Sequence, residues 1–309
     1  MTDESRLRTP FRLAIAAVSL FVTLLIGQLV RQQFGLSRSG MTGLAVSQIT
    51  TMMIVCTVLW IVIRYVDRRQ PSDYGLVPVT AQWVRECGVG TVVGGGLIIA
   101  IAVGGLGTGA VQIAGLLTTQ SESQFVTTSA NGATISIVGE LVAAVIFAIG
   151  VAVSEEAIIR GYLLPNVESG VAFFTERYAT LGAMAITSGL FAVLHLANPG
   201  ATVLGTLNTF LAGMWFAAAY VFTRRLGLAV GLHLGWNLLL GAGVGLPVSG
   251  FLLPVTIIDL EVSGSTLLLG NTYGPEAGLF ASVAIVAGIV VVGWYADTPR
   301  TRTFAGRRE

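Results

Sequence analysis

Eight long apolar segments constrain the fold of this chain more than any other feature of its sequence. Each holds about twenty residues, the length that an α-helix needs to cross the hydrocarbon core of a bilayer. Only 11% of the 309 residues are charged, whereas soluble domains carry about 25%. The sequence therefore predicts an all-α polytopic membrane protein with about eight transmembrane helices. The segments run approximately over residues 11–30, 44–63, 88–106, 135–153, 179–197, 203–222, 226–246 and 277–294.

The first apolar segment follows several arginines, as a secretory signal peptide would. It is too long for a signal peptide, and the sequence after it, LVRQQFGLSRSG, has no small-x-small cleavage site. We therefore expect this segment to remain in the protein as a membrane anchor.

The arginines occur almost entirely on alternate connections between the apolar segments. Among the 17 basic residues, all of them Arg, only Arg31 and Arg38 lie on the other connections. Arginine marks the cytoplasmic side of membrane proteins. We therefore expect a multi-pass protein of the cell membrane with both termini in the cytoplasm. The long connections 107–134 and 247–276 contain no basic residue and should lie on the outer side.

The composition excludes several classes of function. The chain has no lysine, which rules out a lysine nucleophile, a Schiff base and a P-loop lysine. A formal net charge of +1 gives no large electrostatic attraction to nucleic acid. The two cysteines, Cys56 and Cys87, have no paired spacing and are expected to be small buried hydrophobic residues. The glycines within the apolar segments favour close helix packing, and no internal repeat supports a transporter with inverted halves.

A charged stretch, VAVSEEAIIRGYLLP at residues 151–165, directly follows the fourth apolar segment. Ionisable side chains inside a bilayer cost about 2.5 to 3.5 kcal/mol each and need partners. Glu156 and Arg160 lie four residues apart on one helix face, so we expect them to neutralise each other. Glu155 points about 100° away and is left free for chemistry. These residues alone also fit a surface ion pair at a cytoplasmic helix end, and Pro165 is expected to mark a bend or helix end.

Both histidines of the chain lie inside apolar segments. The segment ending GLFAVLHLANPG has Phe191 and His195 four residues apart. The segment containing GLHLGWNLLL has His233 and Asn237 at the same spacing, so imidazole and carboxamide can point to one place. A lone histidine on an apolar helix is usually a packing residue. Two such histidines, one with an asparagine a turn away, favour a functional cluster.

Depth in the membrane tests whether these side chains can meet. At 1.5 Å per residue, Glu155 lies about 10 to 15 Å below the arginine-rich side, His233 about 12 Å and Asn237 about 18 Å. His195 comes out deeper, at roughly 25 Å, and is geometrically the weakest member of the cluster. Glu140 lies about 22 Å outward of Glu155 and is left out of the site.

Three motifs, EEAIIR, FAVLH and HLGWN, occur in order on separate apolar segments. They resemble the motifs of the CAAX-protease and bacteriocin-processing (CPBP) family, EExxxR, FxxxH and HxxxN or HxxxD. The DYGL before the third segment is also similar, whereas Ile159 stands where the family often has an aromatic residue or Met. On this resemblance we expect a single membrane domain, 1–309, with a catalytic core at about 73–240. An N-terminal two-helix region, 1–72, and a C-terminal helix, 277–296, complete it.

The resemblance implies an intramembrane endopeptidase, a hydrolase that cleaves a membrane-associated protein or peptide. Glu155 matches the glutamate that activates water. Glu156 matches the second glutamate, with Arg160 as its partner. His195 matches the histidine that helps to position the water.

His233 and Asn237 match the pair that stabilises the oxyanion. Peptide hydrolysis needs a base for water and donors for the developing negative charge, and these residue types supply both. The resemblance suggests prenylated CAAX proteins as substrates if the chain is like the eukaryotic members. It suggests peptide maturation or bacteriocin immunity if the chain is like many prokaryotic ones. No feature of the sequence indicates recognition of a lipid. The oligomeric state is open.

The metal dependence of such a site is open from the sequence. One carboxylate and two histidines, here Glu155, His195 and His233, form the ligand set of some catalytic zinc sites. The HExxH motif of zinc peptidases is missing, and a glutamate bound to metal would require another base. The resemblance implies a glutamate-driven, metal-free mechanism, and on that ground we favour a reaction without metal or cofactor over a zinc-dependent one. The alternative function is a non-catalytic scaffold, immunity protein or small transporter that uses the same cluster for binding.

Overall fold

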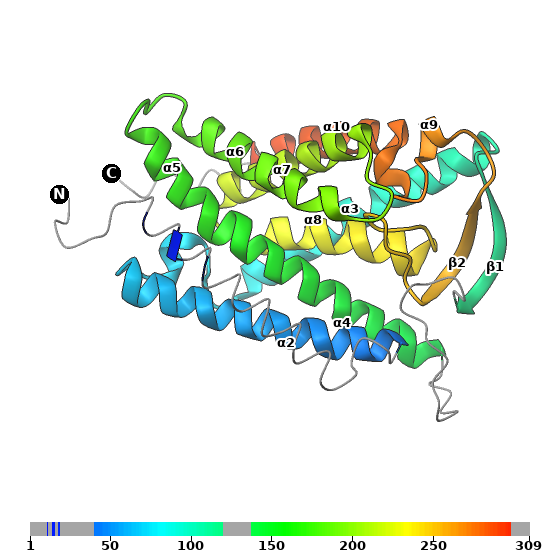
Figure 1. Ribbon diagram of the computed structural model, residues 1–309, viewed down its shortest axis with the longest axis horizontal. Coiled ribbons are helices and arrows are strands. Elements are labelled where there is room, and N and C mark those ends of the chain that lie inside the picture. The colour runs from blue at the N-terminus through cyan, green and yellow to red at the C-terminus, as the bar shows by residue number, and fades with distance from the viewer. Residues whose placement is uncertain (1–10, 12–13, 16–17, 19–39, 120–136, 298–309) are drawn as a thin grey trace.

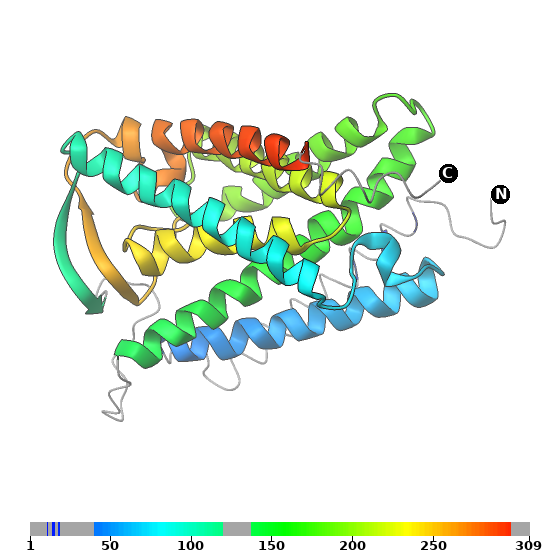
Figure 2. The same cartoon turned by 180° about the vertical axis from the view of Figure 1, so that it is seen from behind.

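The computed structural model describes residues 40–119 and 137–297, together with residues 11, 14, 15 and 18. The expected first membrane span, 11–30, falls almost entirely outside these residues. The described part of the chain is a bundle of apolar helices that lie beside one another along its long axis (Figures 1 and 2). It is 73% helical, which confirms the predicted all-α polytopic fold.

Six helices of the described residues are long and apolar enough to cross a membrane. They are α2 (Gly40–Ile61, extended by η2, Val62–Val66), α3 (Ala81–Gly107), α4 (Ile137–Glu156, extended by η4, Ala157–Leu163, and α5, Leu164–Ala172), α6 (Ala179–Leu194, extended by η5, His195–Ala197), α7 (Val203–Thr223) and α10 (Leu279–Ala296). A shorter apolar helix is α8 (Gly227–Leu238), which η6 (Leu239–Gly243) extends. These helices account for the seven predicted spans that follow the first.

The helix that carries the two adjacent glutamates does not end at Pro165. It passes from α4 into the π-helical turn η4 and then continues as α5 to Ala172. Pro165 lies in the first turn of α5, a position where a missing N–H is tolerated. Of the two alternatives expected at Pro165, a bend or a helix end, the helix end was therefore wrong, and the helix changes type just before the proline.

The α3–α8 contact brings two helix backbones together at glycine. A Cβ atom on Gly231 would lie 2.0 Å from the carbonyl oxygen of Cys87, and one on Gly235 would lie 2.2 Å from that of Thr91. Neither distance is sterically possible, so these positions of α8 admit only glycine at this separation. The contact confirms that glycines in the apolar segments serve helix packing. It fixes α8, which carries His233 and Asn237, against the rest of the bundle.

A two-stranded antiparallel sheet, absent from the sequence-based prediction, lies at one end of the bundle (Figure 1). It pairs β1 (Val111–Thr119) with β2 (Val255–Val262), from Val111 opposite Val262 to Thr119 opposite Val255. Its strands come from the two connections that lack basic residues. Because about 140 residues separate the paired strands, the sequence contains no hairpin turn that would indicate their pairing.

The described arginine-bearing connections lie at the opposite end of the bundle from β1 and β2. They are the segment after α2, the segment between α5 and α6, and the turn between α7 and α8. At this end, Tyr74 of the DYGL segment stacks on Tyr162 with 5.7 Å between ring centroids. Both tyrosine hydroxyl groups donate hydrogen bonds to the buried carboxylate of Asp67. This contact joins Tyr74, the last residue of η3 (Pro71–Tyr74), to the helix that carries the glutamates.

Candidate active site

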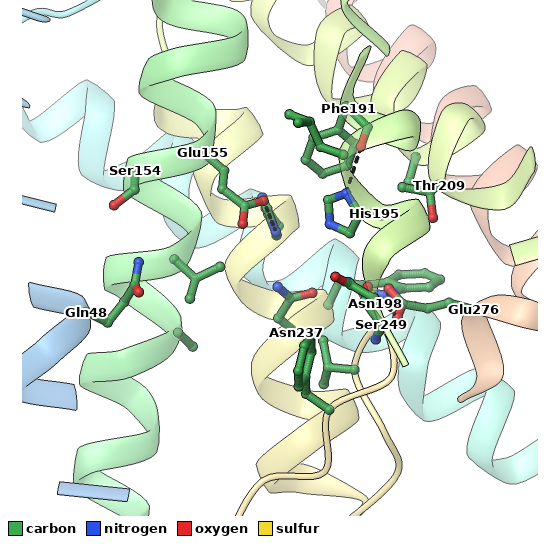
Figure 3. Close-up of a pocket in the computed structure, with 18 of the residues that line it drawn as sticks. Gln48, Ser154, Glu155, Phe191, His195, Asn198, Thr209, Asn237, Ser249 and Glu276 are labelled. Carbon is green, nitrogen blue, oxygen red and sulfur yellow. Dashed lines mark hydrogen bonds and ion pairs between the residues drawn. The ribbon is translucent and has the colours of Figure 1, made fainter. Parts of the chain in front are cut away.

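A cavity of about 710 Å³ lies inside the bundle, within the size range of small-molecule and peptide pockets. Its wall is built by α2, α4 with η4, α6, α7, α8, the loop after η6 and the start of α10. Four of the predicted site residues line it, namely Glu155, His195, His233 and Asn237. Figure 3 shows the labelled members of this group, Glu155, His195 and Asn237, around one space.

Glu156 and Arg160 form the ion pair that their spacing predicts. The two side chains are completely buried, and Nη1 of Arg160 lies 2.8 Å from Oε1 of Glu156. The guanidinium also donates to the carbonyl oxygen of Gly213 on α7, at 3.1 Å. The pair lies in the protein interior, so the alternative of a surface ion pair is wrong.

Glu156 has a second contact that the sequence did not reveal. The Nδ1 atom of His233 lies 2.9 Å from Oε1 of Glu156, the same oxygen that Arg160 contacts. A carboxylate oxygen can only accept a hydrogen bond, so Nδ1 of His233 must carry the proton and donate it. Glu156 therefore fixes the orientation of the His233 ring, as carboxylates behind functional histidines commonly do.

Two phenylalanines separate Arg160 from the cavity. The guanidinium carbon lies 4.7 Å from the ring centroid of Phe191 and 5.3 Å from that of Phe216. Phe216 also stacks on the imidazole of His233, at 5.0 Å and an interplanar angle of 14°. Such cation–π contacts are attractive and strengthen when water is excluded. Arg160 thus neutralises Glu156 from behind an aromatic wall and is not among the residues that line the cavity.

Glu155 and Glu156 are adjacent on one helix, so their side chains point in directions about 100° apart. The side chain of Glu155 is 35% exposed, whereas that of Glu156 is not exposed. The Oε2 atom of Glu155 is 3.8 Å from Nε2 of His233, a separation too long for a direct hydrogen bond. Among the described residues, this buried oxygen has no hydrogen-bond partner. Of the two adjacent glutamates, Glu155 is therefore the one that lines the cavity, and its Oε2 atom retains acceptor capacity.

His195 joins the cluster in spite of its predicted depth. The helix α6 ends at Leu194, and the 3₁₀ turn η5 begins at His195 itself. The Nδ1 atom of His195 donates a hydrogen bond to the carbonyl oxygen of Phe191, at 2.7 Å. The ring centroids of His195 and Phe191 are 4.5 Å apart. This bond leaves Nε2 of His195 available toward the cavity. The count of residues along a straight helix overstated the separation, because it took no account of how α6 is placed in the bundle.

Asn237 lies one turn beyond His233 on α8, where the spacing predicted it. Its half-buried carboxamide lines the cavity between the side chains of Glu155 and Ser249 in the view of Figure 3. The carboxamide can donate two hydrogen bonds and accept others. The structure thus brings an acid, two imidazoles and an amide from α4, α6 and α8 to one cavity.

Glu276 is a cavity residue that the sequence analysis missed. Its carboxylate accepts hydrogen bonds from Nε1 of Trp236 at 3.1 Å and from the hydroxyl of Ser249 at 2.9 Å, and also from the Ser249 backbone N–H. Burial raises the pKa of Glu276, although its hydrogen bonds from Ser249 oppose this shift. The only signal in the sequence was a single acidic residue in the segment NTYGPEAG, just before the last span.

The helix α2 also contributes to the cavity, through Gln48. Gly150 of α4 allows this approach, because a Cβ atom there would lie 2.8 Å from Cγ of Gln48. Figure 3 shows Gln48 beside Ser154, one residue before Glu155. The cavity wall therefore extends beyond the 73–240 core that the motifs indicate, since both Gln48 and Glu276 lie outside it.

A metal ion would need several ligands close together. In the part of the chain that the structure describes, no three His, Cys, Asp or Glu side chains are grouped so that they could hold one ion. Glu155, His195 and His233 share the cavity without forming such a group.

Fold and site define an integral membrane protein of helical spans with an acid–imidazole cluster in an internal cavity. Residues 137–239 match a family model described as type II CAAX prenyl endopeptidase Rce1-like. The matched segment spans about a third of the chain and contains all three motifs. This match supports the family that the motifs predicted, and at the level of the family it supports a CAAX-type membrane protease. No curated protein matches the chain.

Proposed function

We propose that this protein is an intramembrane endopeptidase that uses Glu155 to activate water against a peptide bond of a membrane-associated protein or peptide. One observation carries the proposal. The partly exposed side chain of Glu155, one oxygen of which has no hydrogen-bond partner among the described residues, lines a cavity that also holds both imidazoles and Asn237. A general base must retain acceptor capacity for the proton it takes, and Glu155 does.

The reaction starts with a water molecule in the space between Glu155 and the imidazoles. Glu155 takes one proton from this water as its oxygen attacks the carbonyl carbon. The carbonyl oxygen becomes an oxyanion, to which Asn237 donates an N–H and His233 adds favourable charge. The C–N bond then breaks, and Glu155 returns its proton to the leaving amine. No net proton is consumed by the enzyme.

The hydrogen bonds of the two histidines suit these roles. His195 donates Nδ1–H to the Phe191 carbonyl, so Nε2 of the neutral ring can accept a hydrogen bond from the attacking water. His233 donates Nδ1–H to Glu156, whose negative charge stabilises the imidazolium when Nε2 carries a proton as well. Arg160 supports this arrangement from the side away from the cavity.

The substrate is membrane-associated, because the cavity lies within the spans of the bundle and much of its wall is apolar. We infer that it enters from the arginine-bearing end, which the positive-inside rule assigns to the cytoplasm. A prenylated chain is one candidate substrate, and a peptide under maturation is another.

The reaction is proposed to run without metal or cofactor. Treatment of the purified protein with a chelator, followed by metal analysis, tests this point. Unchanged cleavage is expected. Stoichiometric zinc together with loss of activity that zinc restores would contradict it, and would make Glu155, His195 and His233 the ligands to examine.

The substitution Glu155→Gln tests the function itself, because it removes the base and keeps nearly the same shape. The membrane proteome and peptidome of cells with the unaltered chain are compared with those of cells with this variant. Cleavage products should disappear from the variant. The matched control is Glu176→Gln on the exposed connection after α5, which should leave them in place.

The same comparison separates hydrolysis from a binding function. If a cellular phenotype of the protein persists with Glu155→Gln at equal protein level, the protein acts as a scaffold, immunity protein or transporter. Uptake that depends on an ion gradient would identify a transporter among these.

A further inference from the structure

The cavity contains acidic side chains and no basic one. Among its lining residues the carboxylic acids are Glu155 and Glu276, and none is Arg. The chain has no lysine, and Arg160 lies behind Phe191 and Phe216. The two imidazoles are therefore the only cavity groups, among the described residues, that can carry positive charge.

Glu276 lies apart from Glu155 within this space. Figure 3 shows the two carboxyl groups on either side of His195 and Asn237, with Ser249 beside Glu276. Glu276 belongs to η7 (Pro275–Ala277), which precedes α10, whereas Glu155 lies in the last turn of α4. Glu276 is therefore in a position to contact a side chain beside the scissile bond, if that bond lies between Glu155 and Asn237.

The partners of Glu276 are neutral. Trp236 and Ser249 hold its oxygens in fixed positions, and neither supplies a positive charge. A proton added to His195 would favour ionised Glu276, while burial opposes ionisation. The carboxylate form of such a buried group is stabilised by a neighbouring cation. A second carboxylate in the same space would be repelled by it, at a cost that the apolar wall increases.

We propose that Glu276 is a specificity-determining residue, which makes this part of the cavity accept a basic or neutral substrate side chain and reject an acidic one. The proposal deepens the proposed function and rests on it, because it assigns the substrate class of the same cavity. Selection against the wrong charge is a common source of specificity, and like charges brought together in an interface cost several kcal/mol. The unaltered protein is therefore expected to prefer substrates with Lys or Gln at the position facing Glu276 over substrates with Glu there by at least about tenfold.

The experiment uses the full-length protein in proteoliposomes and one apolar fluorogenic peptide. The peptide is made with Lys, Gln or Glu at a single position, and this position is moved along its length. For at least one position, the Lys and Gln peptides should be cleaved about tenfold faster than the Glu peptide. Equal cleavage of the three peptides at every position would overturn the proposal without any variant.

Three variants assign the preference to Glu276. Glu276→Gln should remove the difference between the Lys and Glu peptides, when the rate for each is expressed relative to that of the Gln peptide in the same variant. Glu276→Asp keeps the charge and should keep the preference. Ser249→Ala removes one hydroxyl donor, keeps the carboxyl group and should also keep the preference. A preference that persists unchanged in folded Glu276→Gln would show that another group sets it.

Peptide binding separates this proposal from the proposed function. Affinities of the same peptides are measured with Glu155→Gln and with Glu155→Gln combined with Glu276→Gln. If the unaltered protein cleaves no peptide, the endopeptidase proposal fails. The order of affinities still decides the role of Glu276, because a Lys-over-Glu preference that depends on Glu276 supports it and equal affinities contradict it.

Discussion

Arg160 is a fully buried cation in a bundle of apolar helices. It is stabilised on several sides, by the Glu156 carboxylate at 2.8 Å, by the Gly213 carbonyl at 3.1 Å and by the faces of Phe191 and Phe216. Removal of one member of a buried ion pair leaves the other charge unpaired in a medium of low dielectric constant. The stability of the protein should therefore depend on this residue as much as its activity does.

The substitution Arg160→Ala should lower the free energy of unfolding by about 3 to 5 kcal/mol, because Glu156 then stays buried without its cationic partner. Thermal unfolding in detergent measures the effect. Arg177→Ala is the control, since Arg177 is exposed, contacts the Tyr178 ring and should have little influence. An unfolding temperature of Arg160→Ala equal to that of the control would contradict the stabilising role of the buried pair.

Asn237→Ala should lower kcat by about 10²- to 10³-fold with little change in KM, because the carboxamide donates to the oxyanion only as negative charge develops. Steady-state kinetics on a cleaved peptide measures both constants. The Glu155→Gln variant with and without Asn237→Ala serves as a control for binding, and the two should have similar affinity for the peptide. A change confined to KM would instead make Asn237 a substrate-binding residue.

The sequence predicted contacts within a helix and missed contacts between helices. A spacing of four residues was enough to pair Glu156 with Arg160 and to align His233 with Asn237. The bond between Glu156 and His233 joins positions 77 residues apart, and nothing in local periodicity indicates it. Glu276 was missed for the same reason, since its place in the cavity follows from how the segment before α10 folds back toward α8.

At the scale of elements, α3 and α8 pack at a distance that only glycine permits, and α8 carries His233 and Asn237. Gly231→Ala should destabilise the protein by about 1 to 3 kcal/mol, because its methyl group collides with the Cys87 backbone and forces the helices apart. Activity should fall as well, since His233 and Asn237 move with α8. Thermal unfolding and peptide cleavage measure the two effects.

The control for this variant is Gly96→Ala on α3, where a Cβ atom would meet nothing within 4 Å. Alanine is the better helix former, so this change should leave stability unchanged or slightly increase it. Similar unfolding temperatures for the two alanine variants would show that α8 shifts at no cost, and would contradict the close-packing argument.

Hydropathy predicted the helices because a bilayer requires long apolar spans whose backbone groups are satisfied internally. It could not predict the β1–β2 pair, whose strands lie in separate connections. It also could not predict the π-helical turn η4, in which Arg160 lies, since local helix type depends on packing that the pattern does not encode. Such π-helical turns often occur at functional sites, and this one adjoins the candidate general base.

At the scale of the whole molecule, the cavity is lined both by the segment that matches the family model and by parts of the chain outside that segment. The family match, 137–239, contains the three motifs and the helices α4 to α8. The remaining wall comes from α2 on one side and from the segments after η6 on the other. The motif-bearing helices thus supply the proposed chemistry, and the flanking elements complete the space into which a substrate would fit.

The two ends of the bundle differ in charge in a way that sets its orientation. The described connections at one end carry Arg64, Arg68, Arg69, Arg177, Arg224 and Arg225, and the β1–β2 end carries acidic residues such as Asp259 and Glu261. Positive residues are retained in the cytoplasm during insertion. We therefore expect the connection after α5 to be cytoplasmic and β2 to lie outside.

Single cysteines at Glu176 and Glu261 test this orientation in a background that carries Cys56→Ala and Cys87→Ala. Both glutamates are exposed, one on the connection after α5 and the other on β2. A membrane-impermeant maleimide added to intact cells should label Glu261→Cys, because β2 faces outward, and should label Glu176→Cys only after permeabilisation. Unchanged peptide cleavage by both variants confirms that they are folded. The reverse labelling pattern would show that the bundle has the opposite orientation in the membrane. The substrate would then have to reach Glu155 from the outer side.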